Sequence, residues 1–506
     1  MDPTPQIRVS GAEHESVSRT HVARKELDDV ENQLAELKAR RSLLQADVNA
    51  TTDPLTRQIP LEIASYIFEL FLMAHIAEED WPDFLGRYIP FRLTKPAAPL
   101  RLAAVCKQWR NIAWSLPQLW TTLVVDLHCK HSALGPEIVS QWLMRTKNLP
   151  LVIKIGTFGG VQKCSECITA NGQAIIRTIN RHASQWRLLD FTSLPSGLLQ
   201  ELDDSKSAGM ETPSLLQYLL LGDDSDLPNS NGIPMDQLLR LSKRNHCPTH
   251  LRIASSIPPS QINIQWTHLT HLELSFCTVP ASLAIISLAS ISPLRSLALV
   301  NFFGPSDEWW ALSRPVVLPD LLFLSIDDPT PAGLISQSIL NCLEVPSLTS
   351  LHLARDTESE SSGDLPVASI ISLLGRSNCM LHYFTLIHWP VSDSALVQLL
   401  NKTPTLTTLT IDLHWTSDPL ILLNRLSQAD FTTSHDPFLP NLQTLDLTSP
   451  LPVSWTPLIG VFDCSPADIS DANHLIQQAP SPQANIPVVR SWYRLLCPVF
   501  LNLPSA

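Results

Sequence analysis

Two cysteines, Cys164 and Cys167, stand at the C-x-x-C spacing used by zinc sites and by thiol redox centres. A structural zinc site needs four ligands, and no second C-x-x-C or H-x-x-x-H pair follows at finger spacing. A redox centre needs a thioredoxin-like β-α-β context and a group that lowers the thiol pKa, for which the neighbouring Lys163 is weak evidence. We therefore interpret the pair as a coincidence and keep a thiol-redox enzyme as a remote alternative.

Other enzyme motifs are missing from the sequence. It contains no G-x-x-x-x-G-K-[ST] phosphate loop, G-x-G-x-x-G fingerprint, H-E-x-x-H zinc motif or G-x-S-x-G nucleophile elbow. The 13 tryptophans and 16 histidines are spread along the chain without clustering. The sequence therefore predicts no catalytic residue, no metal site and no cofactor, and a protein that is not an enzyme.

The composition is that of a globular chain with room for more than one domain: 506 residues, 44% hydrophobic and 16% charged. A formal net charge of -13 argues against a nucleic-acid partner, because phosphate binding needs clustered Lys and Arg. The longest apolar run, Ala281–Ile291, is too short to span a bilayer, and Met1–Gln6 lacks the apolar segment of a secretory signal. Ten scattered cysteines suit reduced thiols, so we expect no membrane association and a cytoplasmic or nuclear location, or both.

The first 50 residues divide into an arm and a helix. Residues 1–20 are polar, contain proline and show no period, which predicts a disordered arm. Over 21–50, apolar residues alternate by three and four, as in an amphipathic or coiled-coil helix. The seam consists of Leu27, Val30, Leu34, Leu37, Arg41, Leu44 and Val48, with Arg41 as its interruption. Weak self-association through this helix and its packing back on the same chain are both compatible with the pattern.

Residues 54–127 contain two apolar helical stripes. Pro60 suits the first turn of a helix in which Ile63, Ile67 and Leu70 recur at i, i+4 and i+7. A second segment, 100–113, repeats apolar residues at helical spacing and ends before Pro117. Roughly forty residues of helix cannot bury two such stripes by themselves, so they need either the rest of this chain or a second protein.

Three pieces of this region, in order, resemble the F-box in the version common in mushroom-forming fungi. They are Pro60-Leu61-Glu62-Ile63 with Ile67-Phe68, Val105-Cys106-Lys107-Gln108-Trp109-Arg110, and Pro117-Gln118-Leu119-Trp120. The resemblance implies docking on the Skp-type adaptor of a cullin-RING ubiquitin ligase. The matching adaptor-binding positions are Pro60, Leu61, Ile63, Ile67, Leu102, Val105, Cys106, Trp109, Leu119 and Trp120. The pattern departs from a compact F-box in an insert, residues 75–99, between the two helices.

After residue 127 the motif L-x-x-L-x-L recurs. In six copies, with first leucines from Leu269 to Leu406, the spacings are 25, 27, 27, 33 and 25 residues. This period resembles that of leucine-rich repeats, roughly 20–29 residues, in which each unit is a short strand plus a returning helix or loop. Of the Asn or Cys residues that such repeats place after the last leucine, only Cys277 is present. We predict an irregular solenoid over 128–450, and a cap or partly disordered tail over 451–506.

The expected fold class is therefore an α-helical N-terminal region followed by an irregular α/β leucine-rich-repeat solenoid. Side chains between the leucines of each strand point to the opposite face of the sheet, which solenoids use to bind proteins. For any single residue an ordinary solvated surface is the simpler interpretation. Phe323, Tyr383 and Ile387 are the least polar members of this face, so we select them as a candidate client-binding site.

Together these features favour a non-catalytic substrate-recognition subunit of an SCF-type cullin-RING ubiquitin ligase. In this hypothesis the F-box-like helices dock on the adaptor and the solenoid binds a protein client. The alternative is a protein-interaction scaffold in which the same helices pack internally and recruit no ligase.

Overall fold

The computed structural model of the protein describes residues 12–52, 59–77, 98–127, 135–156, 165–194, 196–199, 201–202, 215–223, 246–254, 262, 264–302, 315–328, 334–355, 364–412, 420–427 and 438–448. Within these residues the chain forms two compact units. The first contains the helices before Leu123, together with residues 144–149, and the second contains a β-sheet with its own helices.

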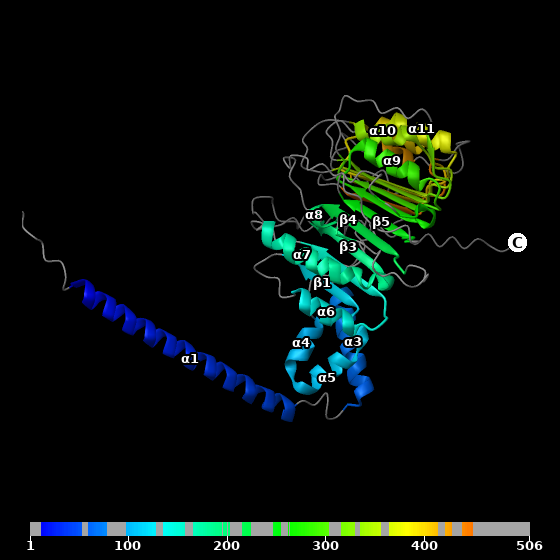
Figure 1. The fold of residues 1–506 in the computed structure, drawn as a ribbon. Helices are drawn as coiled ribbons and strands as arrows, with labels where there is room; N and C mark the ends of the chain where they lie inside the picture. The colour runs from blue at the N-terminus through cyan, green and yellow to red at the C-terminus, as the bar shows by residue number, and fades with distance from the viewer. Residues whose placement is uncertain are drawn as a thin grey trace, which may run out of the picture. The chain divides into compact units, whose positions relative to one another are not determined.

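Helix α1 (Ala12–Thr52) is one uninterrupted helix of 41 residues, drawn in blue in Figure 1. The helix predicted over 21–50 therefore begins earlier, and the second half of the predicted disordered arm, 12–20, is helical. Residues 12–20 contain neither Gly nor Pro, so extending an existing helix through them costs little. All side chains described in α1, from residue 24 to residue 48, are exposed.

Three further helices and a 3₁₀ turn complete the first unit. They are α3 (Leu61–Ala77), α4 (Ala98–Val105), α5 (Lys107–Ser115) and η1 (Pro117–Trp120). The segment read from sequence as one helix, 100–113, is broken at Cys106, whose backbone is extended with φ -155° and ψ 171°. Of the predicted insert, 75–99, the two ends belong to α3 and α4, and residues 78–97 lie outside the described residues.

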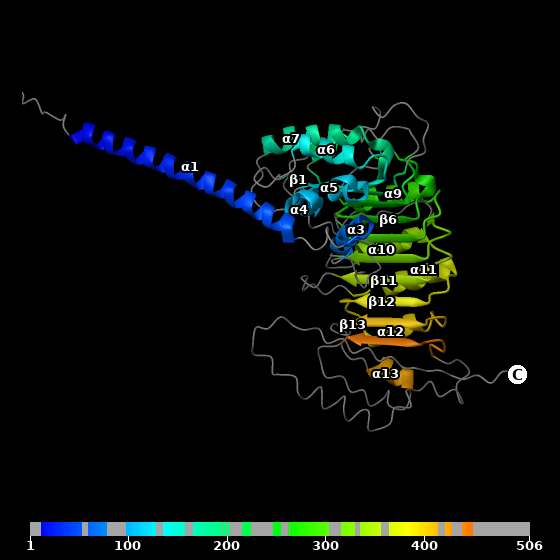
Figure 2. The same ribbon diagram turned by 90° about the horizontal axis from the view of Figure 1, so that it is seen from below.

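The second unit is built on a sheet of 12 strands that follow one another in chain order. Its strands are β1 (Thr122–Asp126), β2 (Leu151–Gly156), β3 (Trp186–Leu194), β4 (Tyr218–Asp223), β5 (His250–Ala254), β6 (His271–Ser275), β7 (Ser296–Val300), β9 (Phe323–Asp328), β11 (Ser350–Arg355), β12 (Tyr383–Ile387), β13 (Thr408–Asp412) and β14 (Thr444–Thr448). Every neighbouring pair from β2 to β14 is parallel, and Figure 2 shows the strands as successive rungs. The predicted class is thus confirmed as helices followed by a mostly parallel, solenoid-like α/β sheet.

Helices return the chain between successive strands. They are α6 (Pro136–Arg145), α7 (Ser165–Asn180), α8 (Ser196–Leu199), α9 (Val279–Ala289), α10 (Leu334–Cys342), α11 (Val367–Ser377), α12 (Asp393–Leu400) and α13 (Leu420–Ser427). Figure 1 shows α9, α10 and α11 together along one face of the sheet. The predicted boundary at residue 127 falls earlier, because β1 already belongs to the sheet; the predicted tail, 451–506, lies outside the described residues.

The leucines of the repeated motif occupy equivalent positions in the sheet. Leu272, Leu297, Leu324 and Leu351 pair across four successive strands, and all four are buried. A strand of five or six residues cannot cover its own leucines. The leucines of each strand are therefore buried by those of the neighbouring strands and by the helices on that face of the sheet. Strand β14 ends the sheet, and its Leu445 is accordingly only half-buried.

The turns after several strands share a left-handed backbone conformation that was not predicted from the sequence. Phe276, Asn301 and His388 directly follow β6, β7 and β12, and have positive φ values of 54°, 50° and 58°. Left-handed backbone is uncommon for residues other than glycine, although Asn and His adopt it more readily than most. The sheet compensates, since the Phe276 N–H donates to the Val300 carbonyl at 3.0 Å. Cys277, next in the chain, is buried and its thiol donates to the Ser275 carbonyl at 3.4 Å.

Buried carboxylates in the second unit hold helix starts. Asp328 at the end of β9 accepts hydrogen bonds from the Ser336 N–H at 2.9 Å and the Ser336 hydroxyl at 2.7 Å, near the start of α10. Asp393 on α12 accepts from the Ile421 N–H at 2.6 Å and the Leu422 N–H at 3.0 Å, at the start of α13. Both acids satisfy helix N–H groups that have no partner inside their own helix, so their burial has a structural cause.

We expect Leu324→Ala to destabilise the sheet strongly. Leu324 is fully buried in the middle of the leucine rows, and removing such a side chain costs about 2–5 kcal/mol in the free energy of unfolding. Leu322, two residues earlier, is 42% exposed, and Leu322→Ala is the matched control, with an expected effect within about 0.5 kcal/mol. Chemical denaturation followed by circular dichroism measures both; equal losses would contradict the difference in burial between Leu324 and Leu322.

Candidate functional site

Helix α3 begins where the sequence favours a helix start. Pro60 precedes it, and the Pro60 carbonyl accepts hydrogen bonds from the Ile63 and Ala64 N–H groups, both at 3.0 Å. Glu62 lies in the first turn, where a negative charge interacts favourably with the helix dipole. The start of the first predicted stripe is therefore fixed by local backbone chemistry.

One face of α3 packs inside the first unit. Ala64, Phe68 and Leu72 recur at i, i+4 and i+8 and are all buried. The Phe68 ring lies 5.0 Å from the Trp109 ring of α5, centroid to centroid, with the planes tilted by 52°. This aromatic pair joins the two predicted stripes.

The other faces of α3 leave large apolar side chains exposed. The exposed set comprises Leu61 (58%), Ile63 (50%), Tyr66 (56%), Ile67 (36%) and Leu70 (48%). A helix that is apolar on more than one side is normally covered on more than one side. The α3 patch, as we call these five residues, is therefore the first candidate interaction surface.

Helix α5 is held in place by groups that also appeared in the sequence motif. Cys106 is the N-cap of α5, and its Sγ accepts a hydrogen bond from the Trp109 N–H at 3.4 Å. The Trp120 indole N–H donates to the Ala113 carbonyl at 2.8 Å, which ties η1 to α5. The Arg145 guanidinium lies 5.0 Å from the centre of the Trp120 ring, at cation–π distance.

The ten predicted adaptor-binding residues fall into two groups. Pro60, Leu61, Ile63, Ile67 and Val105 are exposed, and Trp109 is half-buried. Leu102, Cys106, Leu119 and Trp120 are buried. The buried four hold the helices together in this conformation and offer no surface to a partner. The resemblance that selected these ten positions does not distinguish the exposed group from the buried one. Tyr66, Leu70 and Trp114 (48%) are also exposed but were not among the predicted adaptor-binding positions, although Tyr66 and Leu70 belong to the first predicted helix.

The second candidate surface is the sheet face opposite the leucines. Phe323 and Tyr383 lie in the same row, because both pair with Ser350 of the strand between them. Their Cα atoms are therefore about 10 Å apart, which is twice the spacing between neighbouring strands. Ile387 lies four residues along β12, so it does not join them in one row. Tyr383 is 52% exposed, whereas Phe323 and Ile387 are half-buried.

This sheet face is less open than its alternating pattern predicts. In the next row toward the strand ends, Ala298, Ser325 and His352 are all buried. Farther along the sheet, the same row contains cross-strand ion pairs between Lys154 and Asp190 (3.2 Å) and between Arg252 and Glu273 (3.3 Å). The accessible part of the face is therefore concentrated at the amino-terminal ends of the strands.

That accessible row also contains an aromatic stack that the sequence did not predict. Tyr218, His250 and His271 pair across β4, β5 and β6. The His250 ring stacks on the Tyr218 ring at 4.4 Å and on the His271 ring at 4.1 Å, the latter with planes only 9° apart. Each histidine Nδ1 is hydrogen-bonded to the hydroxyl of the preceding threonine, at 2.9 Å for Thr249 and 2.8 Å for Thr270. A shared T-H-L sequence before both strands could have indicated it.

The stack favours neutral histidines. Burial, with a smaller contribution from the nearby His271, lowers the pKa of His250 to about 4. Burial, and then the Arg295 charge, lowers the pKa of His271 below its usual value. At neutral pH this row thus presents uncharged, flat aromatic surface.

The predicted thiol pair is only partly within the described chain. Cys164 lies outside the described residues, and the backbone of Cys167 lies in α7, with no description of its side chain. In the described ranges no group of three or more His, Cys, Asp or Glu side chains could hold a metal ion. Among the helices of those same ranges, none has the length and apolarity to cross a bilayer.

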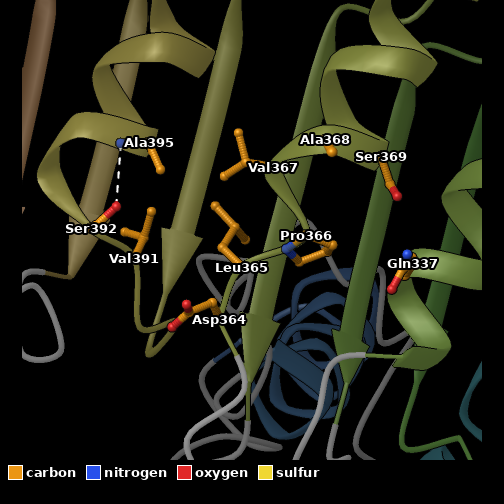
Figure 3. Close-up of a pocket in the computed structure, with 10 residues that line it drawn as sticks. All are labelled: Gln337, Asp364, Leu365, Pro366, Val367, Ala368, Ser369, Val391, Ser392 and Ala395. Atoms are coloured by element: carbon orange, nitrogen blue, oxygen red, sulfur yellow. Dashed lines mark hydrogen bonds between the residues drawn. The ribbon is translucent and has the colours of Figure 1, made fainter.

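A hollow of about 260 Å³ lies beside the starts of α11 and α12. It is lined by Gln337, Asp364, Leu365, Pro366, Val367, Ala368, Ser369, Val391, Ser392 and Ala395. Figure 3 shows that Leu365 and Val367 project between the two helix starts, while Ser392 accepts a hydrogen bond from the Ala395 N–H at 3.4 Å. Asp364 is the single ionisable group among the ten, so these residues do not form a nucleophile with its base.

Comparison with known proteins adds no relative to this picture. No protein-family model matches the chain. A search of curated proteins finds no similar sequence.

The neutral histidines predict how stability depends on pH. Both lose proton affinity on folding, so between about pH 6.5 and about pH 4 the unfolded chain binds more protons than the folded one. The free energy of unfolding should therefore fall as the pH drops through this window. Replacing both histidines, as His250→Gln with His271→Gln, should reduce that slope.

Urea denaturation at a series of pH values measures the effect. Ser296 pairs with His271 on the next strand and has no titratable side chain, so Ser296→Ala is the matched control and should leave the slope as it is. A slope unchanged in the double variant would show that the stack does not take up protons on unfolding.

Proposed function

We propose that the protein is a non-catalytic substrate receptor of an SCF-type cullin-RING ubiquitin ligase. The helices of the first unit would act as an F-box that docks on a Skp-type adaptor, and the sheet unit would act as a leucine-rich-repeat-like solenoid that holds a protein client. The observation that carries the proposal is the exposed apolar surface of α3 at the positions of the F-box-like motif. Such a subunit would work in the cytoplasm or the nucleus.

The α3 patch is large enough to matter for binding. Burying a Leu or Ile completely is worth about 1.5–3 kcal/mol, so half-exposed side chains gain about half of that on contact. The five residues of the patch together then supply several kcal/mol, which is comparable with the cost of bringing two proteins together. We therefore expect α3 to need support from neighbouring exposed groups, and Val105 and Trp109 are the motif residues of α4 and α5 that could supply it.

Two features support the client-binding half of the proposal. The chain-ordered parallel sheet matches the spacing of the repeated leucines, and repeat architectures of this kind bind proteins on an extended sheet face. The same face carries the row that includes Phe323 and Tyr383, with the stack of Tyr218, His250 and His271 in line with it. Aromatic residues dominate the energy of many protein interfaces.

The proposed mechanism is proximity. A receptor with one surface for the ligase adaptor and another for the client raises the effective concentration of the client near the ubiquitin-loaded enzyme. No catalytic group on this chain is required, because the transfer chemistry belongs to the other subunits of such a ligase.

Binding to a purified Skp-type adaptor tests the proposal. The wild-type chain should bind, and Ile63→Asp with Ile67→Asp should weaken binding at least about 100-fold, because two apolar contacts become desolvated charges. Both isoleucines are exposed in the free chain, so the fold should be retained.

Ile138→Asp is the matched control for this experiment. Ile138 is an exposed isoleucine on the helix α6 of the sheet unit, and its substitution should leave adaptor binding unchanged. A wild-type chain that does not bind the adaptor, or an Ile63 and Ile67 variant that binds as well as wild type, would contradict the proposal and favour the scaffold alternative.

A further inference from the structure

Helix α1 presents an apolar seam whose side chains are exposed. Six of the seven seam positions hold exposed apolar side chains: Leu27, Val30, Leu34, Leu37, Leu44 and Val48. On an uninterrupted helix they form one stripe about 30 Å long, at 1.5 Å per residue. The chain therefore carries a second exposed apolar surface, which shares no residue with the α3 patch.

The charges along the seam are arranged so that the first half of one α1 helix attracts the second half of another copy. Residues 26–31 carry Glu26, Asp28, Asp29 and Glu31, whereas residues 38–41 carry Lys38, Arg40 and Arg41. One end of a helix with this layout complements the other end of an identical helix running in the opposite direction. We propose that α1 pairs antiparallel with α1 of a second copy of this chain.

A parallel, in-register pair is disfavoured by the same residues. It would place Arg41 against Arg41 of the second copy in the middle of the apolar seam. It would also place Glu26 beside Glu31 of the second copy, because these positions flank the seam of a parallel pair. Like charges in such positions are destabilising.

The antiparallel pair removes both conflicts. With Leu34 opposite Leu37 of the second copy at the centre, Arg41 lies opposite Val30, and Lys38 lies beside Glu31. Symmetry repeats each of these contacts, so Glu31 of each copy faces the basic segment of the other. The like-charge contact that this register creates among the flanking positions, Glu26 with Asp47, lies at the ends of the seam, where salt screens it.

The seam length sets the strength of the pair. It covers about three heptads, close to the minimum for a stable coiled coil, so the pair should be reversible and depend on protein concentration. The inference does not rest on the proposed function, because it uses no residue of α3 or of the sheet.

Sedimentation equilibrium of the full chain, up to about 100 μM, tests for the pair. The wild type should reach the mass of a dimer, and Leu34→Asp with Leu37→Asp should remain monomeric throughout. The matched control is Leu43→Asp: Leu43 is 69% exposed but lies off the seam, so this variant should dimerise like the wild type. A monomeric wild type, or a Leu43→Asp variant as monomeric as the seam variant, would overturn the proposal.

Charge reversal determines the direction of the pair. In the antiparallel arrangement Glu31→Lys replaces two attractive contacts with two repulsive ones and should weaken the dimer about tenfold. Adding Lys38→Glu to it should restore the wild-type dissociation constant. In a parallel pair Glu31→Lys would instead strengthen the dimer, because it would turn the Glu26 contact attractive, and that result would overturn the antiparallel assignment.

Discussion

Helix α3 carries more apolar side chains than one packed face can cover. Ala64, Phe68 and Leu72 turn inward, and the Phe68–Trp109 contact fixes that choice, so Ile63 and Tyr66 cannot turn inward as well. This geometry makes a surface that water covers poorly and that a second apolar surface would cover better. The proposed role of the first unit rests on this constraint and on no property of the second unit.

In the described part of the sheet unit, by contrast, most apolar side chains are buried within the chain. Each leucine row is covered by the next row and by returning helices, and buried acids such as Asp328 and Asp393 satisfy helix starts between repeats. The accessible face of the sheet therefore contains the side chains that do not pack inside: the neutral stacked rings of His250 and His271, and Tyr383 in the same row. A regular interior thus supports an irregular surface, on which the proposed client-binding site lies.

The sequence predicts these elements well where a period is strong. The six L-x-x-L-x-L copies mark strands β6, β7, β9, β11, β12 and β13 in the sheet. A motif or a period does not tell which residues face a neighbour inside the unit, so the motif match grouped the buried Leu102 and Trp120 with exposed residues such as Ile63. The Tyr218–His250 stack depends on pairing between strands more than thirty residues apart, which no local pattern specifies. The break at Cys106 depends on a single capping bond.

Backbone hydrogen exchange on the free chain and on its mixture with a purified Skp-type adaptor tests the central claim most directly. The account predicts that the adaptor slows exchange in residues 61–72 of α3 and around Val105, while exchange in the sheet strands stays as it was. Unchanged exchange in α3 at adaptor concentrations that saturate binding, or protection confined to the sheet, would contradict the claim that the uncovered face of α3 is a docking surface.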